Sequence, residues 1–432
     1  MFGIYFHIPF CKSKCGYCDF YSVASQTLVQ PMVEAMLQEV ELRKNYFDNI
    51  VIPCSTRKRS SAQANLQIEG LQVKPAMTDE KNEATLYFGG GTPSLLQPAQ
   101  IAALAQKVIQ TFGVKNVTEF TVEINPDDAT TEYLQALRNI GVNRLSIGIQ
   151  SFFDDDLQRV NRRHTAQQAK LSVQNAQKVG FKNISVDLIY GLPQMTLEHW
   201  RSNLETAFSL NIQHLSAYAL SVEERTPFGV QQRKGQLFLP TENEVAEQSA
   251  LLDELSAQHN FTRYEISNFG KKGFFSQHNT AYWQQKPYIG LGPSAHSYSG
   301  AQRQNNVANN ALYMERIAGC HSALDAETKF GASQSPNREI AGQARNDKFF
   351  ELENLTSEQR YNEYIFTGLR TMWGIDLNYI EQVFDKKLYD YCCKNLSQLI
   401  DNKIVILKNN KITIPQNKWI VADSIIVDLI WA

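Results

Sequence analysis

HIPFCKSKCGYCDF, residues 7–20, contains three cysteines, Cys11, Cys15 and Cys18, in the spacing CxxxCxxC. Three thiolates at this spacing can bind three corners of an iron–sulfur cube and leave the fourth iron open to a substrate or cofactor. The alternatives are a zinc site, a disulfide or chance, and no second Cys or His pair stands at zinc-ribbon spacing. The stretch therefore predicts a [4Fe–4S] cluster with one open iron.

Composition and charge narrow the class of protein. The 432 residues are 43% hydrophobic, which is enough for one large domain and a small one. The 42 basic and 44 acidic residues give a net charge of −2, so nothing in bulk charge favours nucleic acid or an anionic membrane. The chain shows neither a signal segment nor an apolar stretch of roughly eighteen residues that could span a bilayer.

Cysteine usage indicates the compartment. Seven cysteines is an odd number, and three of them are clustered like ligands, which fits a reduced compartment better than a disulfide framework. We therefore expect a cytoplasmic protein. The remaining four are expected to be ordinary thiols: Cys54, Cys320, Cys392 and Cys393.

Strand-like and helix-like patterns alternate through the first half of the chain. The predicted strands are rich in apolar and β-branched residues and cover 2–8, 84–88, 118–124, 144–149, 183–189 and 214–220. Between them apolar residues recur on one helical face, for example Val33, Met36, Leu37 and Val40. The alternation predicts an α/β fold with a parallel sheet, arranged as a (β/α) barrel or an incomplete one.

Two polar segments and a distinct tail interrupt this pattern. Residues 53–83, which include the RKR run at 57–59, and residues 325–350 are interpreted as surface insertions. From residue 356 onward two helical stretches precede KIVIL and KITIP, two short segments around Asn409 and Asn410 that are typical of a hairpin. We expect a main domain at 1–300, a connecting segment at 301–355 and a small winged-helix-like domain at 356–432.

Unusual residues fall where the predicted strands end. The cysteine loop follows the first strand, Gly89-Gly90-Gly91-Thr92-Pro93 follows the second, Glu123 ends the third, and Gln150 follows the fourth. Asp187 lies near the end of the fifth strand. Because the carboxyl ends of parallel barrel strands form one face, these residues are expected to converge on one rim.

The cysteine loop and this rim together resemble the radical S-adenosylmethionine (radical SAM) superfamily. The resemblance implies a six-unit partial barrel and a reduced cluster that cleaves S-adenosyl-L-methionine to a 5′-deoxyadenosyl radical. A carboxylate suits a ribose hydroxyl or an ammonium group, and Arg162 suits the methionyl carboxylate. The expected cofactor contacts are Tyr5, the backbone at Tyr17, Gly90, Gly91, Thr92, Glu123, Gln150, Arg162 and Asp187.

Longer motifs narrow the branch of the superfamily. HIPFCKSKCGYCDF, YFGGGTPSLL, RLSIGIQSF, VDLIYGLP, RYEISNF and HNTAYW occur in this order and resemble the oxygen-independent coproporphyrinogen III oxidase group. That group contains true dehydrogenases and HemW-type heme chaperones. The dehydrogenases carry a fourth cysteine, CxxxCxxCxC, and a long segment before the loop; here position 20 is Phe20, and only ten residues precede Cys11.

The segment from 278 to 283 favours the chaperones. It matches HNxxYW, which the resemblance associates with heme binding through His278, Asn279, Tyr282 and Trp283. His278 is the expected iron ligand, since histidine binds heme iron, with His7, His164 and His296 as alternatives.

Two functions therefore remain. The first is a heme carrier that delivers heme to acceptor proteins, with an electron donor such as flavodoxin or ferredoxin and a possible homodimer. The second is an enzyme that decarboxylates coproporphyrinogen III to protoporphyrinogen IX.

Overall fold

Six parallel strands form the centre of the fold. The computed structural model describes residues 1–49, 83–330 and 349–431. All six predicted strands are present: β1 (Phe2–Ile8), β2 (Glu83–Gly90), β3 (Asn116–Ile124), β4 (Arg144–Gln150), β5 (Ile184–Tyr190) and β6 (His214–Ala219). Each strand pairs in parallel with the next one along the chain. The predicted parallel α/β sheet is therefore confirmed.

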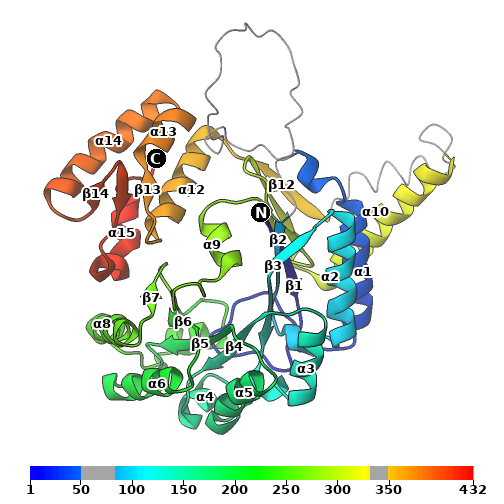
Figure 1. Cartoon of the computed structure of the whole chain (residues 1–432), viewed down its shortest axis with the longest axis horizontal. Helices are drawn as coiled ribbons and strands as arrows, with labels where there is room; N and C mark the ends of the chain where they lie inside the picture. Colours follow the sequence, from blue (N-terminus) through cyan, green and yellow to red (C-terminus); the bar gives the residue numbers. More distant parts are fainter. Residues whose placement is uncertain (50–82, 331–348, 432) are drawn as a thin grey trace, which may run out of the picture.

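Helices cover the outer side of this sheet (Figure 1). They are α1 (Val29–Leu42), α2 (Pro98–Thr111), α3 (Thr131–Asn139), α4 (Asp154–Arg159), α5 (Ala166–Lys178), α6 (Leu197–Ser209) and α8 (Glu242–Gln258). The predicted apolar face of α1 is buried at Val33, Met36 and Val40. It joins a core with the outward side chains of β1, including Ile4 and Phe6. Burial of such faces is the main favourable contribution to folding.

The sheet extends beyond the six central strands at both ends. Past β1 it continues through β9 (Tyr288–Leu291), β10 (His296–Tyr298), β11 (Gln302–Asn306) and β12 (Phe350–Asn354), and past β6 through β8 (Asn268–Gly270) and β7 (Thr262–Arg263). The twelve strands end at β12 on one side and β7 on the other, and within the described residues these two edges do not pair. The barrel is therefore open, as the expected partial barrel requires. The region expected as a connecting segment, 301–355, contributes β11, α10 (Asn310–Phe330) and β12 to this structure.

The inner side of the central strands is polar. Tyr5 of β1 lies opposite Tyr87 of β2, which lies opposite Thr121 of β3. Further round the barrel, Asp187 of β5 lies opposite Ser216 of β6. Barrels of this type are usually filled by branched apolar side chains. Here the interior instead offers hydroxyl, carboxyl and imidazole groups.

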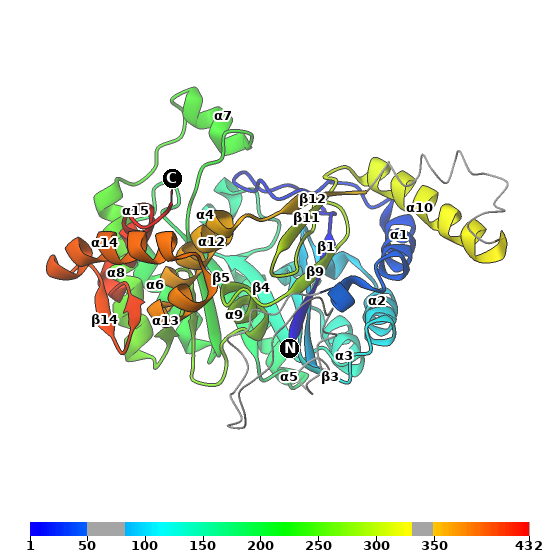
Figure 2. The ribbon, with the colours of Figure 1, turned by 90° about the horizontal axis from the view of Figure 1, so that it is seen from above.

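Two short helices lie at opposite ends of the barrel strands. The helix α9 (Gln277–Trp283) lies on the inner side of the sheet and packs against β1, β2 and β3. Figure 2 shows α9 toward the amino end of β1, whereas α7 (Pro227–Arg233) projects past the opposite end of the strands.

The C-terminal residues form a second core. Its helices are α12 (Ser357–Leu369), α13 (Leu377–Val383), α14 (Lys386–Asp401) and α15 (Ala422–Val427), and its sheet has the order β13 (Ile375–Asp376), β15 (Lys411–Thr413), β14 (Ile406–Lys408). The predicted hairpin is present, since β14 and β15 pair antiparallel around Asn409 and Asn410. Helices followed by this hairpin give the expected winged-helix-like unit.

Direct contacts join this unit to the barrel. The backbone N–H of Met372 donates to the carbonyl of Tyr264 at 3.0 Å, and the Gln416 amide donates to the carbonyl of Arg263 at 3.0 Å. Arg303 of β11 forms an ion pair of 2.6 Å with Glu363 of α12.

Two sequence expectations fall largely outside the described residues. Residues 50–82, which contain the RKR run and Cys54, and residues 331–348 of the second predicted insertion are not among them. In the part of the chain that is described, no helix combines the length and apolar character needed to cross a membrane.

Candidate functional site

The cysteine loop follows β1 and is held by backbone hydrogen bonds. The N–H of Cys11 donates to the carbonyl of Val23 at 3.0 Å, and the N–H of Gly16 donates to the carbonyl of Val160 at 3.0 Å. Asn161 donates from its side chain to the carbonyl of Lys14 at 2.7 Å. These bonds fix the loop from both sides, so the thiols are presented at the carboxyl end of the barrel.

Helix α7 adds a further restraint to this loop. The N–H of Phe228 donates to the carbonyl of Gly16 at 2.9 Å. The Phe228 ring is so close that a Cβ added at Gly16 would lie 2.8 Å from it. A side chain at position 16 would therefore require the Phe228 ring to shift.

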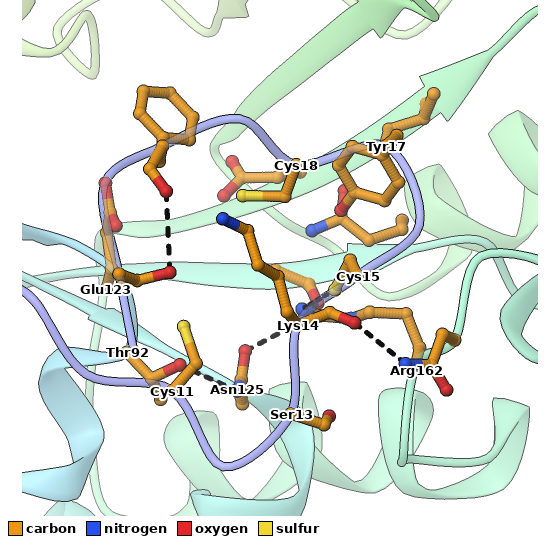
Figure 3. Close-up of a pocket in the computed structure, with 18 of the residues that line it drawn as sticks. Cys11, Ser13, Lys14, Cys15, Tyr17, Cys18, Thr92, Glu123, Asn125 and Arg162 are labelled. Atoms are coloured by element: carbon orange, nitrogen blue, oxygen red, sulfur yellow. Dashed lines mark hydrogen bonds between the residues drawn. The ribbon is translucent and has the colours of Figure 1, made fainter. Parts of the chain in front are cut away.

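The three thiols line one cavity of about 380 Å³. Figure 3 shows Cys11, Cys15 and Cys18 on the loop around it. Burial, with the neighbouring Cys15 and Cys11 thiols, raises the pKa of Cys18 to about 11, although the backbone bond from Phe20 opposes this. A bound metal would favour the thiolate form that is otherwise disfavoured here.

This arrangement fits a cluster better than a single ion. Among the described residues, no three His, Cys, Asp or Glu side chains converge closely enough to hold one metal ion. A cubane needs no such convergence, because each thiolate binds a different iron. Three free thiols around one cavity are the donor set that a three-cysteine [4Fe–4S] cluster requires.

The glycine motif holds the end of β2 against the cysteine loop. The N–H of Gly91 donates to the carbonyl of Ile8 at 2.8 Å, and the N–H of Thr92 donates to the carbonyl of Phe10 at 2.7 Å. A Cβ at Gly91 would lie 2.5 Å from the carbonyl oxygen of Phe10. Gly90 has a φ of +103°, a backbone conformation that residues with a side chain rarely adopt. All three residues also line the cavity.

Two inward carboxylates lie deeper in the same cavity. Glu123 accepts a hydrogen bond of 2.8 Å from the Tyr87 hydroxyl. Burial raises its pKa to about 7, the Tyr87 bond opposes this rise, and the charge of Asp187 adds to it. Burial also raises the pKa of Asp187, and hydrogen bonds from Ser216 and Ser146 partly offset that effect. Both groups can accept hydrogen bonds from ribose hydroxyls or an ammonium group.

Arg162 connects the carboxylate region with the cluster loop. It donates to Asn125 Oδ1 at 2.9 Å and to the carbonyl of Gly148, and its Nη1 lies 3.6 Å from Cys15 Sγ. Its buried Nε has no partner within the described residues. A guanidinium that lines the cavity with a spare donor fits the expected role toward a methionyl carboxylate.

Most of the predicted cofactor contacts meet at this cavity, which is lined by Tyr17, Gly90, Gly91, Thr92, Glu123, Gln150, Arg162 and Asp187 as well as the three cysteines. Tyr5 is not part of the lining; its hydroxyl instead lies 3.1 Å from His7 Nδ1. Sequence reasoning missed Asn125 and Tyr218, which also line it. Their positions just after β3 and late in β6 are the signal that could have found them.

The HNxxYW segment lies at the other end of the barrel. It forms α9, and His278 is buried with its Nδ1 2.8 Å from the Thr85 hydroxyl. Its ring stacks on Tyr87 with centroids 5.0 Å apart. Burial, with a smaller effect of Arg144, lowers its pKa to about 3, so the imidazole is neutral. Tyr282, one turn further along, is exposed, and Asn279 and Trp283 are partly buried.

Glu119 of β3 anchors the start of α9. Its carboxylate accepts hydrogen bonds from the backbone N–H groups of Gln277 at 2.8 Å and His278 at 3.0 Å. The guanidinium of Arg144 lies 4.0 Å away. A carboxylate at a helix N-terminus satisfies free N–H groups and favours the helix dipole.

The alternative histidines come from three separate segments of the chain. His7 is buried and its Nε2 lies 2.8 Å from the carbonyl of Tyr21. His164 is also buried, with its Nε2 3.0 Å from the carbonyl of Ile149. His296 is exposed on β10.

Comparison with known proteins agrees with this geometry. A family model described as the radical SAM superfamily matches residues 5–207, and one described as the HemN C-terminal domain matches 355–418. A protein named heme chaperone HemW from Bacillus subtilis is 33% identical over 90% of this chain and 88% of its own length. The chain belongs to the HemW heme chaperone family.

Other relatives extend this family assignment. A heme chaperone HemW from Lactococcus lactis is 31% identical over 93% of this chain and 90% of its own. A mitochondrial protein from Bos taurus, radical S-adenosyl methionine domain-containing protein 1, is 29% identical over 99% of this chain and 87% of its own. Among solved structures, coproporphyrinogen III oxidase (HemN) from Escherichia coli has a TM-score of 0.74 at 19% identity, covering 99% of this chain and 90% of its own. This likeness confirms the fold of the HemW-family chain.

Proposed function

We propose that this chain is a heme carrier that binds heme, a [4Fe–4S] cluster and S-adenosyl-L-methionine and passes heme to acceptor proteins. The observation that carries the proposal is the 33% identity to a named heme chaperone across 90% of the chain. That match covers both the barrel and the C-terminal unit. The cavity described above supplies separate groups for the two resident cofactors.

The cofactors are assigned to residues by their chemistry. Cys11, Cys15 and Cys18 would hold the cluster. Glu123 and Asp187 would accept hydrogen bonds from the ribose or amino group of S-adenosyl-L-methionine, and Arg162 would donate to its carboxylate. When bound, the reduced cluster and its cofactor supply radical chemistry, whose reactivity belongs to those groups rather than to the protein. The chain itself orients them and limits the access of water.

Coproporphyrinogen III dehydrogenation is the alternative function. The likeness to HemN shows a shared fold, and the polar barrel interior is compatible with a polar substrate. Position 20, however, is Phe20 rather than the fourth cysteine of the dehydrogenase motif, and its side chain is 64% exposed at the cavity edge. It cannot supply a thiolate there.

One paired experiment separates the two functions. The cluster-reconstituted protein is titrated anaerobically with heme and, in a second sample, incubated with S-adenosyl-L-methionine, a reductant and coproporphyrinogen III. We expect stoichiometric heme uptake, seen as a Soret shift, and no protoporphyrinogen IX. Conversion of coproporphyrinogen III with no heme uptake would establish the enzyme instead.

The remaining partners follow from this proposal. An acceptor protein receives the heme, and a donor such as flavodoxin or ferredoxin reduces the cluster. We further propose a cytoplasmic location and a homodimer. Size-exclusion chromatography with light scattering, with and without heme, would test the dimer.

A further inference from the structure

One aromatic side chain at the edge of the cofactor cavity packs into neither hydrophobic core. Phe20, two residues after Cys18, lines the cavity, and its side chain is 64% exposed. It belongs to neither core cluster of the described residues, whereas Tyr17 of the same loop packs against the barrel core. A single exposed apolar side chain is ordinary on a protein surface, but this one borders a cavity. A molecule bound in the cavity could cover the ring and remove it from water.

The backbone that follows Phe20 is tied to the rest of the fold. The N–H of Val23 donates to the carbonyl of Pro9 at 3.0 Å, and the Tyr21 hydroxyl accepts a hydrogen bond of 2.8 Å from the N–H of Asn310. The Phe20 ring can turn between rotamers about its own side-chain bonds while these contacts stay in place. It can therefore fold onto a bound molecule without a rearrangement of the cysteine loop.

The polar groups of S-adenosyl-L-methionine already have partners in the proposed site. Arg162 is assigned to its carboxylate, and Glu123 and Asp187 are assigned to its ribose or amino group; all three line the cavity. The adenine is the flat part of the molecule that none of these side chains addresses. Every nucleobase has a π face on which an aromatic side chain can stack.

The two tyrosines of the cavity lining are engaged elsewhere. The hydroxyl of Tyr17 hydrogen-bonds with the Cys15 thiol, and the hydroxyl of Tyr218 hydrogen-bonds with Ser216. Each phenol is thus committed to a polar neighbour. Phe20 has no polar atom in its side chain, so its ring orientation is free to follow a ligand.

We propose that Phe20 is a specificity-determining residue for the cofactor, with its ring folded over the cavity edge and stacked on the adenine of S-adenosyl-L-methionine. This inference rests on the proposed binding of that cofactor and adds the contact that selects its base. The contact makes and breaks no covalent bond. Since the dehydrogenase motif has a cysteine at this position, the stacked ring distinguishes this chain from those enzymes.

The test uses the full-length, cluster-reconstituted protein in anaerobic calorimetry. The probes are S-adenosyl-L-methionine and S-adenosyl-L-homocysteine, which keeps the adenine but lacks the sulfonium charge. Phe20→Ala should weaken the binding of both by about five- to 150-fold, the range expected for loss of one base–aromatic stack. Phe20→Trp should retain the affinity, because indole also stacks on a base, and Phe20→Leu should give an intermediate value.

A second exposed phenylalanine provides the matched control. The Phe238 side chain is 74% exposed and lines a different cavity, so Phe238→Ala should bind both probes as the wild type does. Iron content and the free energy of unfolding should be unchanged in Phe20→Ala, because the ring packs into neither core. These two measurements separate the loss of a stacking contact from general damage to the cysteine loop.

The outcomes distinguish the role of Phe20 from the proposed function. Wild-type affinity for both probes in Phe20→Ala would overturn the inference and leave the proposed cofactor site intact. A loss confined to S-adenosyl-L-methionine would place the ring against the sulfonium and overturn the adenine assignment. Loss of iron in Phe20→Ala, or weak binding in Phe20→Trp, would also overturn it. A wild-type protein that binds neither probe would refute the proposed cofactor, and the inference with it.

Discussion

The three cysteines of the loop are expected to have no substitutes among the other thiols. Cys11→Ser, Cys15→Ser or Cys18→Ser should each abolish a stable cluster, because each removes one of three iron ligands. Iron analysis after anaerobic reconstitution should fall from about four irons per chain in the wild type. Cys393→Ser, in the C-terminal unit, is the control and should keep its iron. A variant without all three loop cysteines that still assembled the cluster would refute the site.

Gly91 tests the contact between the glycine motif and the loop. A Cβ there would lie 2.5 Å from the carbonyl oxygen of Phe10 and 2.8 Å from that of Ile8. Gly91→Ala should destabilise the fold by about 1–3 kcal/mol through this overlap. It should also lower both the iron content and the affinity for S-adenosyl-L-methionine. Denaturation measures the loss of stability, iron analysis the iron content, and calorimetry the affinity.

The control for Gly91 is a glycine with free space around it. Gly319 in α10 has no atom within 4 Å of an added Cβ. Gly319→Ala should leave both ligands unaffected and stabilise the helix slightly. Equal behaviour of the two variants would show that the close approach at Gly91 is unimportant.

Glu123 gives the apoprotein a pH dependence. Its pKa is raised in the folded state to about 7, above the ordinary value of 4.5. In this pH range the folded protein therefore holds a proton at Glu123 that the unfolded chain has lost, so the contribution of Glu123 to the free energy of unfolding should decrease as pH rises from about 4.5 to 7. Glu123→Gln should remove this contribution, seen as a difference in slope from the wild type in urea denaturation at several pH values.

Glu265 is a second buried carboxyl group that contributes to the same pH dependence of stability. Burial also raises the pKa of Glu265 to about 7, while its bond from Ser267 opposes the rise. Glu123→Gln should thus remove only part of this contribution, and the double variant with Glu265→Gln should change the slope further in the same direction. An unchanged slope in Glu123→Gln would mean that folding does not raise the pKa of Glu123.

Among the structural elements, α9 depends on a single distant carboxylate. Glu119→Ala would leave the N–H groups of Gln277 and His278 without their acceptor and Arg144 buried without its anion. Removing one partner of such a buried pair costs about 3–5 kcal/mol. We expect a loss of that size in the free energy of unfolding, together with weaker heme binding.

An exposed glutamate on another helix is the comparison. Glu254 of α8 accepts a hydrogen bond of 3.0 Å from the side chain of Gln258, one turn away. Glu254→Ala should change stability by less than about 0.5 kcal/mol. If Glu119→Ala were equally mild, the carboxylate would not be what holds α9.

The long central strands were predictable and α9 was not. Strands of six to nine residues with continuous apolar content can be read from local sequence. Helix α9 has only seven residues, too few to show a periodicity, and its N-terminus is held by Glu119, which is 158 positions from Gln277 in the sequence. Such a contact belongs to the tertiary structure and leaves no local signal.

The short strands at the edge of the sheet were also missed, because they too depend on tertiary contacts. The strands β9–β12 have three to five residues each and join the sheet only through pairing with β1 and one another. The cavity lining was largely predictable, because β-strand ends in a parallel sheet must meet on one face. The orientation of the HNxxYW helix was not predictable, because the motif alone does not indicate that His278 points inward to Thr85.

For the whole molecule, β2 reaches from one proposed ligand to the other. Thr85 near its start contacts His278 of α9, whereas Gly90 at its end lines the cofactor cavity. Two ligands that bias the same strand are thermodynamically linked, and such linkage is reciprocal. Whatever factor S-adenosyl-L-methionine imposes on heme affinity, heme must impose on S-adenosyl-L-methionine affinity. Calorimetric titrations in both orders should give one coupling constant, and a constant different from one would mean that the state of the cofactor pocket sets how readily the carrier gives up its cargo.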